Sequence, residues 1–102
     1  MPGDPAVVNG KGIDELIREI VVEVLVIPPA RVVPGVALVR DLGAESIDFL
    51  DLVFRLEEAL GTRIPYTRWQ RFLEERLPGA DLSIAITPEL VRAFAEEEMA
   101  RV

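Results

Sequence analysis

The sequence predicts an all-α fold, a bundle of four helices with a long loop between the first two helices and an extended C-terminal part. In several segments, apolar residues recur with the 3.6-residue period of a helix. Clusters of proline and glycine separate these segments, as turns and loops require. Half of the 102 residues are hydrophobic, and a chain of this length suits one domain with one core.

The chain is expected to divide into a flexible tail, residues 1–12, and one helical domain, residues 13–102. The tail is rich in proline and glycine. The first helix should begin at Ile13 and end near Val26, just before two prolines. The β-branched residues that begin at Val21 would also suit a strand. The helical period extends over more than three turns, however, so a helix is predicted.

Residues 27–45 are predicted to form a long ordered loop with at most one short turn, because prolines and glycines recur along it. Long loops in compact domains are uncommon and often functional. Six apolar residues of this loop are expected to be buried: Val32, Val33, Val36, Leu38, Val39 and Leu42.

The third and fourth helices follow clear start signals. The third should begin after Pro65, with Thr67 as its N-cap, and end at Leu77 before a Pro-Gly pair. An extra loop then leads to the last helix. Residues 87–89, Thr-Pro-Glu, provide a cap, a proline at the first helical position and an acid in the first turn.

The second helix, Ser46 to Leu60, carries two separate apolar groups when it is drawn on a helical wheel. Acidic residues crowd its first turn and Gly61 follows its end. One broad arc should face the core: Phe49, Leu52, Val53, Leu56, Ala59 and Leu60. A smaller group beside Ser46 contains Ile47, Leu50 and Phe54. Either a centrally packed helix buries both groups, or the smaller one is a docking surface with a charged rim.

Composition excludes several classes of function. The chain has no cysteine and no histidine, which removes disulfides, thiolate metal sites and every catalytic triad with a histidine base. The only lysine, Lys11, lies in the tail, so a Ser-Lys pair is disfavoured. The sequence therefore predicts no catalytic residue and no metal site.

Charge points to a basic protein partner rather than to nucleic acid or an anionic membrane. The net charge is −7, of which residues 1–61 carry −6 and residues 62–102 carry −1. No apolar run is long enough to span a membrane, and the N-terminus lacks the basic region of a signal peptide. A cytoplasmic monomer without stable membrane insertion is expected.

Ser46 has two explanations. Serine is a preferred N-cap, and the nearby acids Glu45, Asp48 and Asp51 suit the positive end of a helix dipole. A hydroxyl at a helix N-terminus would also place an attached anion near free backbone N–H groups. Gly43 permits the tight backbone entry that would expose such a serine.

Residues 41–48, Asp-Leu-Gly-Ala-Glu-Ser-Ile-Asp, resemble the attachment motif of acyl carrier proteins, usually written Asp-Leu-Gly-Ala-Asp-Ser-Leu-Asp. The resemblance continues without a gap to Pro65. Glu45 replaces aspartate and Ile47 replaces leucine, and neither change removes the serine. After Pro65 the chain departs from an ordinary fatty-acid carrier and is similar to the specialised carriers that deliver very long acyl chains to lipid A.

The resemblance implies that Ser46 accepts 4′-phosphopantetheine from coenzyme A through a phosphopantetheinyl transferase. The protein would then carry acyl chains as thioesters in fatty acid or lipid biosynthesis, without being an enzyme itself. Its partners would be acyl-chain enzymes with basic docking patches. The implied partner-binding residues are Glu45, Ile47, Asp48, Leu50, Asp51, Phe54, Glu57 and Glu58. Polyketide or aminoacyl cargo, and an unmodified helical adaptor, remain alternatives.

Three groups in the C-terminal part have a structural and a functional interpretation. Trp69 and Phe72 are predicted to be core residues, with the wall of an enlarged acyl cavity as the alternative. The arginines at 68, 71 and 76 are expected on a solvated face, with Glu74 and Glu75 as local partners, or in contact with a lipid phosphate or an acidic partner. Residues 96–98, three glutamates, are expected to be solvated.

Overall fold

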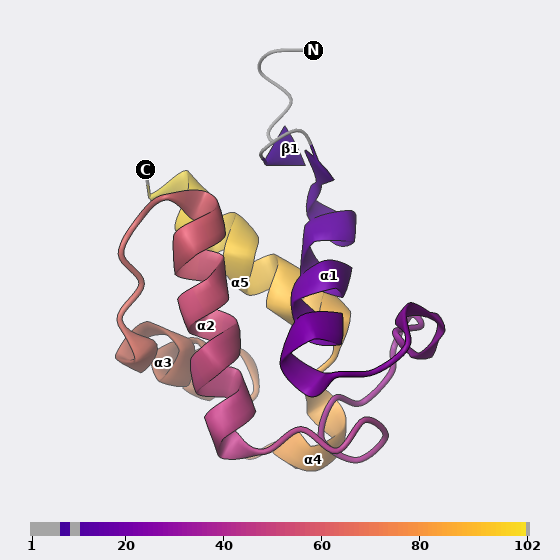
Figure 1. Ribbon diagram of the computed structural model, residues 1–102. Helices are drawn as coiled ribbons and strands as arrows, with labels where there is room; N and C mark the ends of the chain where they lie inside the picture. The colour runs from indigo at the N-terminus through magenta and orange to yellow at the C-terminus, as the bar shows by residue number, and fades with distance from the viewer. Residues whose placement is uncertain (1–6, 9–10, 102) are drawn as a thin grey trace.

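The computed structural model describes residues 7–8 and 11–101. Figure 1 shows the elements in chain order: β1 (Val7–Val8), β2 (Lys11–Gly12), α1 (Ile13–Leu25), a 3-10 turn (Pro29–Arg31), α2 (Ser46–Leu60), α3 (Tyr66–Arg76), α4 (Leu82–Ala85) and α5 (Pro88–Ala100). The all-α prediction is confirmed, with α1, α2, α3 and α5 as the four main helices of the described chain. The short α4 lies in the segment that was predicted to be an extra loop.

The predicted flexible tail contains a short antiparallel ladder. Val7 pairs with Gly12 and Val8 with Lys11. Residues 1–6 and 9–10 lie outside the described chain, so the flexibility of the tail stays a prediction.

The start and stop signals in the sequence predicted the boundaries of α1, α2 and α5 closely. α1 ends at Leu25, and Val26 leaves the helix in the left-handed conformation with φ 54°. At the start of α5, Thr87 Oγ1 accepts a hydrogen bond of 3.2 Å from the Leu90 amide, as its predicted role as a cap requires. The predicted strand alternative for the second half of α1 is excluded.

Thr67 is not the N-cap of α3, so that prediction is wrong. Pro65 takes this position in an extended conformation, and its carbonyl accepts a hydrogen bond of 2.9 Å from the Arg68 amide. Because the carbonyl of Pro65 already closes the first turn, the helix begins at Tyr66 and Thr67 is its second residue.

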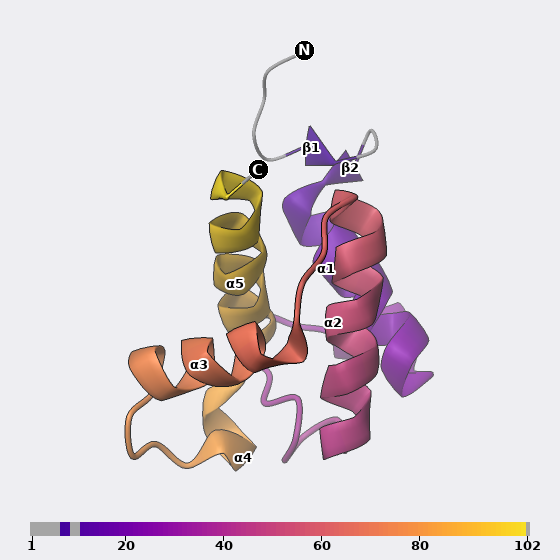
Figure 2. The ribbon, with the colours of Figure 1, turned by 90° about the vertical axis from the view of Figure 1, so that its left-hand side faces the viewer.

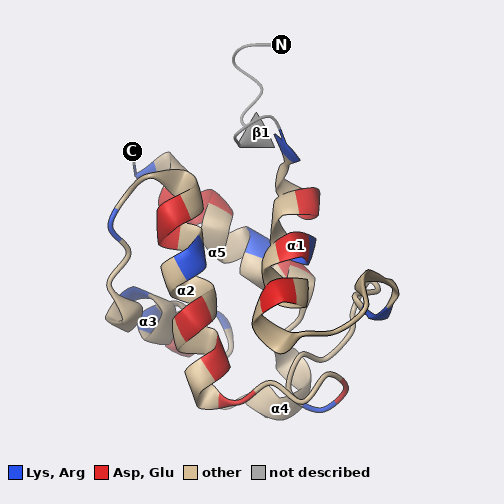
Figure 3. Ribbon diagram, in the orientation of Figure 1, with Lys and Arg blue, Asp and Glu red and all other residues tan. Residues whose placement is uncertain are grey.

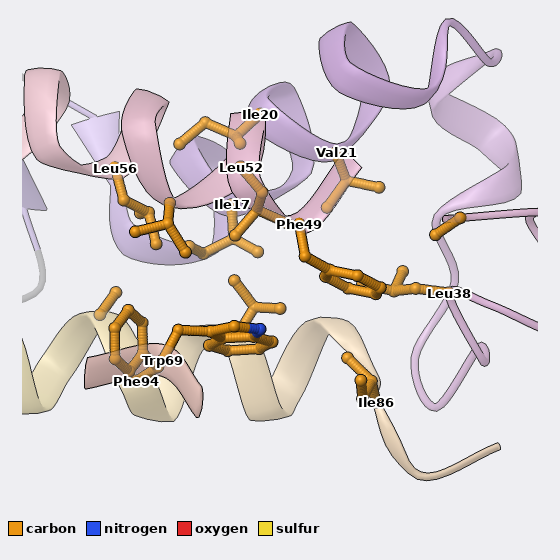
Figure 4. Packing of buried hydrophobic residues seen from close by; sticks show 14 of the residues in the cluster. Ile17, Ile20, Val21, Leu38, Phe49, Leu52, Leu56, Trp69, Ile86 and Phe94 are labelled. Atoms are coloured by element: carbon orange, nitrogen blue, oxygen red, sulfur yellow. The ribbon is translucent and has the colours of Figure 1, made fainter. Parts of the chain in front are cut away.

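The four main helices enclose one core. α1 and α2 lie side by side and run in opposite directions, and α3 lies crosswise to α2 (Figures 1 and 2). Figure 4 shows side chains of α1, α2, α3 and α5 meeting around Trp69, which is 1% exposed. The Trp69 ring stacks on Phe49 with centroids 5.9 Å apart and meets Phe94 edge-on at 5.1 Å. The prediction that Trp69 and Phe72 are core residues is confirmed.

The loop between α1 and α2 packs onto this core and forms backbone hydrogen bonds with the segment around α4. Val32, Val36, Leu38 and Leu42 are buried as predicted and Val39 is half-buried. The Leu38 amide donates to the Ile86 carbonyl and the Arg40 amide to the Ser83 carbonyl, both at 3.0 Å. These two hydrogen bonds hold the chain just before α2 against the chain around α4.

Val33 is 48% exposed, so the expectation that it is buried is wrong. Its amide donates to the carbonyl of Arg31 at the end of the 3-10 turn. In such a tight turn, successive side chains cannot all face the same core, and Val32 takes the inward position.

Glu98 is 2% exposed, which contradicts the prediction that residues 96–98 are all solvated. It shares one face of α5 with the buried residues Val91, Phe94 and Ala95. Its carboxylate lies 3.3 Å from the guanidinium groups of both Arg68 and Arg101. The α5 face that packs inward therefore includes an acid, which is paired with arginine.

Two of the three arginines of α3 pair with α5 rather than with the predicted local partners. Arg68 contacts Glu98, and Arg76 forms an ion pair with Glu97. Arg76 also lies over the Phe72 ring, 4.9 Å from its centroid. Arg71 is exposed, as expected for a solvated face.

Candidate functional site

Ser46 is the first residue of α2 and its side chain is exposed. The N-cap is Glu45, whose backbone is extended with φ −117° and ψ 171°. The Asp48 carboxylate accepts from the Glu45 amide at 2.8 Å, and the Asp48 amide donates to the Glu45 carbonyl at 2.9 Å. The explanation of Ser46 as the N-cap is therefore wrong, because Glu45, one residue earlier, takes this position. The Ser46 hydroxyl makes no hydrogen bond to the described chain.

The backbone before Ser46 is held by a set of short-range hydrogen bonds. Gly43 adopts φ 77°, a left-handed conformation that suits glycine, and its amide donates to the Val39 carbonyl at 3.0 Å. The Asp41 carboxylate accepts from the Ala37 amide at 3.0 Å and from Arg40 Nε at 3.2 Å. These contacts, the backbone one first, lower the pKa of Asp41 below its ordinary value.

A cleft of about 840 Å³ opens beside Ser46, between the start of α2, α3 and α4. Apolar side chains from all three helices line it, including Phe49, Trp69, Leu73 and Leu82. Its volume lies within the range of sites that enclose small ligands. A flexible group attached to Ser46 could therefore place an apolar chain in this cleft.

The smaller apolar group of α2 lies on the surface. Ile47, Leu50 and Phe54, which we call the apolar face, are 69%, 51% and 55% exposed. They border a groove of about 560 Å³ between α2 and the connection to α3. The alternative that α2 buries both apolar groups is excluded, because only the core-facing group is inside the domain.

The acidic residues that were predicted to bind partners all lie on α2 or directly before it: Glu45, Asp48, Asp51, Glu57 and Glu58 (Figure 3). Two of them have roles inside the fold besides that of Asp48 at the cap. Asp51 accepts from Arg55 at 3.2 Å. Glu57 is half-buried, and its Oε1 accepts from the Ile64 amide at 2.8 Å, which fixes the connection to α3.

Sequence reasoning missed the α4 side of the cleft. Leu82, Ser83 and Ile86 contribute to it, but the segment shows no helical period that would have identified them. Tyr66, at the start of α3, was also missed and borders both the cleft and the groove. Partial burial raises the pKa of its hydroxyl.

The described residues show neither a cluster of side chains that could hold a metal ion nor a helix long and apolar enough to cross a bilayer. What they do show is a hydroxyl presented at a helix start, beside an apolar cleft and next to an exposed apolar face. This combination defines a helical carrier domain.

Comparison with known proteins gives the family. The family model described as "Phosphopantetheine attachment site" matches residues 15–68. Acyl carrier proteins of Rhodopseudomonas palustris (strain BisB18) and Bradyrhizobium sp. (strain ORS 278) are 45% and 43% identical to the chain over 53 residues, which are 52% of this chain and 67% of each relative. The acyl carrier protein of Zymomonas mobilis is 45% identical over 51 residues, 50% of this chain and 65% of the relative. No solved structure matches the chain.

The chain belongs to the phosphopantetheine-binding family and is an acyl carrier protein. Proteins of this family carry acyl chains rather than transform them, so the prediction that the chain is not an enzyme is confirmed. The predicted cofactor, phosphopantetheine, is confirmed as the group that the family attaches.

The start of α2 fits this group chemically. The Ser46 and Ile47 amides occupy the first two positions of the helix, where no carbonyl within the helix can accept from them. These free N–H groups and the helix dipole favour a phosphate at this end. The adjacent cleft offers apolar walls to whatever the group carries.

Proposed function

We propose that Ser46 carries 4′-phosphopantetheine and that the protein delivers acyl chains, as thioesters, to enzymes of fatty acid or lipid biosynthesis. One observation carries this proposal. Ser46 is the exposed first residue of α2, next to an apolar cleft, and its hydroxyl has no structural partner in the described chain. Its place in the sequence, residue 46, lies within the segment that the family model matches.

Loading requires a transferase, because the chain supplies no base. The Ser46 oxygen attacks the coenzyme A phosphorus that bears pantetheine, and the bond from that phosphorus to the 3′,5′-ADP oxygen breaks. The proton of the hydroxyl leaves to a base on the transferase, since this chain has no histidine and its only lysine is Lys11. The attached group then provides the thiol that the chain lacks.

The cleft shelters the acyl chain between transfers. Each methylene that enters it is stabilised by about 0.8 kcal/mol, so a chain of several carbons stays inside most of the time. The cleft is open to solvent along Ser46, and the chain can therefore leave when a partner docks. α3 and α4 provide one wall, and the hydrogen bonds from Leu38 and Arg40 keep that wall in place.

The cargo is a long acyl chain. Residues after 68 lie outside the family match, and they add α4 and its side of the cleft. This extra wall supports a cargo like that of the specialised carriers that deliver very long chains to lipid A. A long chain also gains most from a cleft of this volume, because the stabilisation grows with each buried methylene.

Partners dock on α2. The apolar face supplies contact area, and the carboxylates around it, Glu45, Asp48, Asp51, Glu57 and Glu58, attract basic patches on the transferase and the acyl-chain enzymes. Several of these carboxylates already accept hydrogen bonds within the fold, and Glu45 belongs to the capping box of α2, so Glu58 is the acid most available to a partner.

The test is the intact mass of the chain after incubation with coenzyme A and a broad-specificity phosphopantetheinyl transferase. The chain has two serines, Ser46 and Ser83, which provide a matched pair of variants. We expect the mass of one phosphopantetheinyl group to be added to the wild type and to Ser83→Ala, but not to Ser46→Ala. An unmodified wild-type chain whose Ser46→Ala variant still binds its partners would instead identify an adaptor.

A further inference from the structure

Three charged side chains line the groove beside the apolar face, and one of them is unpaired within the described chain. The carboxylates of Asp51 and Glu57 already accept hydrogen bonds, from Arg55 and from the Ile64 amide respectively. Arg63 lies on the other side of the groove, in the connection between α2 and α3. Its guanidinium is exposed and forms no hydrogen bond or ion pair with any described residue. Arg63 is therefore free to contact a partner.

The backbone of Arg63 is restrained from two sides. Its carbonyl accepts a hydrogen bond of 2.8 Å from Arg68, and the amide of the next residue, Ile64, donates to Glu57 at 2.8 Å. Arg68 is itself paired with the buried Glu98 of α5. The restrained connection runs alongside α2 toward the start of α3 (Figures 1 and 2). Because such a segment loses little freedom on binding, Arg63 is well placed for recognition.

Arg63 gives the docking surface charges of both signs. The carboxylates of α2 attract a basic patch, whereas a guanidinium repels one. Like charges that face each other across an interface disfavour a partner, and opposite charges fix its register. A basic patch that extended over the groove would place a cation against Arg63. A carboxylate at that place would pair with Arg63 while a neighbouring apolar side chain fills the groove.

We propose that Arg63 selects the docking partners of this carrier, favouring enzymes that place an acidic residue beside the apolar side chain that enters the groove. This inference rests on the proposed function, because docking on α2 is the step that delivers the cargo of Ser46. It adds a requirement that net charge does not give. A partner must combine basic residues for α2 with one acid for the connection to α3.

The test compares two charge reversals, Arg63→Glu and Arg71→Glu. Arg71 is exposed on α3, has no side-chain partner among the described residues, and lines neither the cleft nor the groove. Neither guanidinium is bonded within the described chain, so both variants should keep the fold. Both make the net charge, −7 in the wild type, more negative by the same amount. Attraction by net charge alone would therefore tighten the binding of a basic partner in both variants.

The docking enzymes are identified by photo-crosslinking in cells that make the protein, from benzoylphenylalanine in place of Phe54, which is 55% exposed and lines the groove. Each enzyme is then purified, and calorimetry gives its affinity for the phosphopantetheinylated wild type and both variants. We expect Arg63→Glu to bind about two- to fivefold more weakly than the wild type, the range of an exposed ion pair. Arg71→Glu should bind at least as tightly as the wild type.

Exchanging the two charges tests the contact itself. Replacing the enzyme's acidic residue beside the crosslinked segment by lysine should weaken binding to the wild type and restore binding to Arg63→Glu. The proposal is overturned by an enzyme that binds Arg63→Glu as tightly as Arg71→Glu, or that has no acidic residue beside the crosslinked segment.

The intact mass separates this inference from the function on which it rests. If the protein gains no phosphopantetheinyl group, the proposed function fails. If it is loaded fully but forms no crosslink from position 54, or if its enzymes do not distinguish the two variants, only the role of Arg63 fails.

Discussion

The position of Ser46 depends on single residues in the loop that precedes α2. Gly43 takes φ 77° three residues before the serine, and no heavy atom lies within 4 Å of a Cβ added there. The Asp41 carboxylate accepts a hydrogen bond from the amide of Ala37, four residues earlier in the chain. Gly43 and Asp41 are thus expected to control both the stability of the loop and the presentation of the hydroxyl.

Replacing Gly43 by alanine should destabilise the fold by about 1–2 kcal/mol, the cost of a left-handed backbone for a residue with a Cβ. Because nothing crowds the added carbon, this cost is conformational. The variant should also be loaded more slowly by the transferase, since the strained backbone leads directly into α2. Urea unfolding and the loading rate would measure the two effects.

Gly79→Ala is the matched control, because Gly79 has φ 73° and equally open surroundings but lies after α3. It should lose similar stability and keep the wild-type loading rate. Equal loading rates for Gly43→Ala and Gly79→Ala would show that the conformation at Gly43 does not govern the presentation of Ser46.

Asp41 should make the stability of the protein depend on pH. Its pKa is lower in the folded chain than the ordinary 3.8, so the folded state favours the carboxylate. The stabilisation is complete above 3.8 and is lost as the pH falls through the lower, folded-state pKa. Asp41→Ala should therefore be less stable than the wild type at neutral pH, and the difference should shrink in acid.

Urea unfolding of both proteins over this pH range would check the prediction. Glu58→Gln provides the control, since it removes an exposed charge of α2 and no hydrogen bond to the described chain. A difference between Asp41→Ala and the wild type that grows as the pH falls would contradict the assigned role.

At the level of elements, ion pairs join α3, which lines the cleft, to α5. α3 carries Trp69 and Leu73 into the cleft, and its Arg68 reaches the buried carboxylate of Glu98 on α5. Arg68 also donates to the Arg63 carbonyl at 2.8 Å, which links the same contact to the connection between α2 and α3. Loss of the pair would leave a charged group partly buried between two helices.

Glu98→Ala should destabilise the protein by about 3 kcal/mol, near the lower end expected for breaking a buried ion pair, because Arg68 remains partly exposed. The neighbouring Glu97→Ala breaks only an exposed pair with Arg76 and should cost less than about 1 kcal/mol. Chemical denaturation of both variants measures the difference. Equal losses would show that the Glu98 contact contributes no more than a surface pair.

The helices that were predictable are those with a sustained period and clear caps. α1, α2 and α5 were located closely because apolar residues recur through more than two turns and because clear signals bound them: Pro28 and Pro29 after α1, Gly61 after α2 and Thr87 before α5. The apolar face of α2 was predictable for the same reason: the wheel separates it from the core group.

The features that were missed depend on contacts between distant parts of the chain. α4 has four residues, too few for a period, and it is held by the Asp81 cap and by backbone bonds from the α1–α2 loop. The burial of Glu98 depends on Arg68, thirty residues earlier, and no local pattern indicates it. The cleft beside Ser46 could not be predicted either, because its wall is formed by α3 and α4.

At the scale of the molecule, the negative charge is concentrated in the part of the chain that contains α1 and α2. Residues 1–61 carry a net charge of −6 and residues 62–102 carry −1. Figure 3 shows acidic residues along α1 and α2 and basic residues on α3. A basic partner is therefore attracted to the side of the molecule that presents Ser46 and the apolar face.

The association rate with the transferase should fall steeply as salt is added, since exposed charges are screened beyond a Debye length of about 8 Å at physiological ionic strength. Leu50→Ser removes part of the apolar face without removing charge. It should weaken binding at every salt concentration and leave the salt dependence unchanged. Stopped-flow measurements would test both effects, and an association rate independent of salt would contradict an electrostatic role for α2.

The central claim is that one hydroxyl, that of Ser46, holds the prosthetic group. Peptide mapping by fragmentation mass spectrometry, on wild-type chain produced together with a transferase, addresses it most directly. The account predicts the phosphopantetheinyl mass on the peptide that contains residue 46, assigned to its serine, with the peptide that contains Ser83 unmodified. A modification at any other residue, or none in the presence of an active transferase, would contradict it.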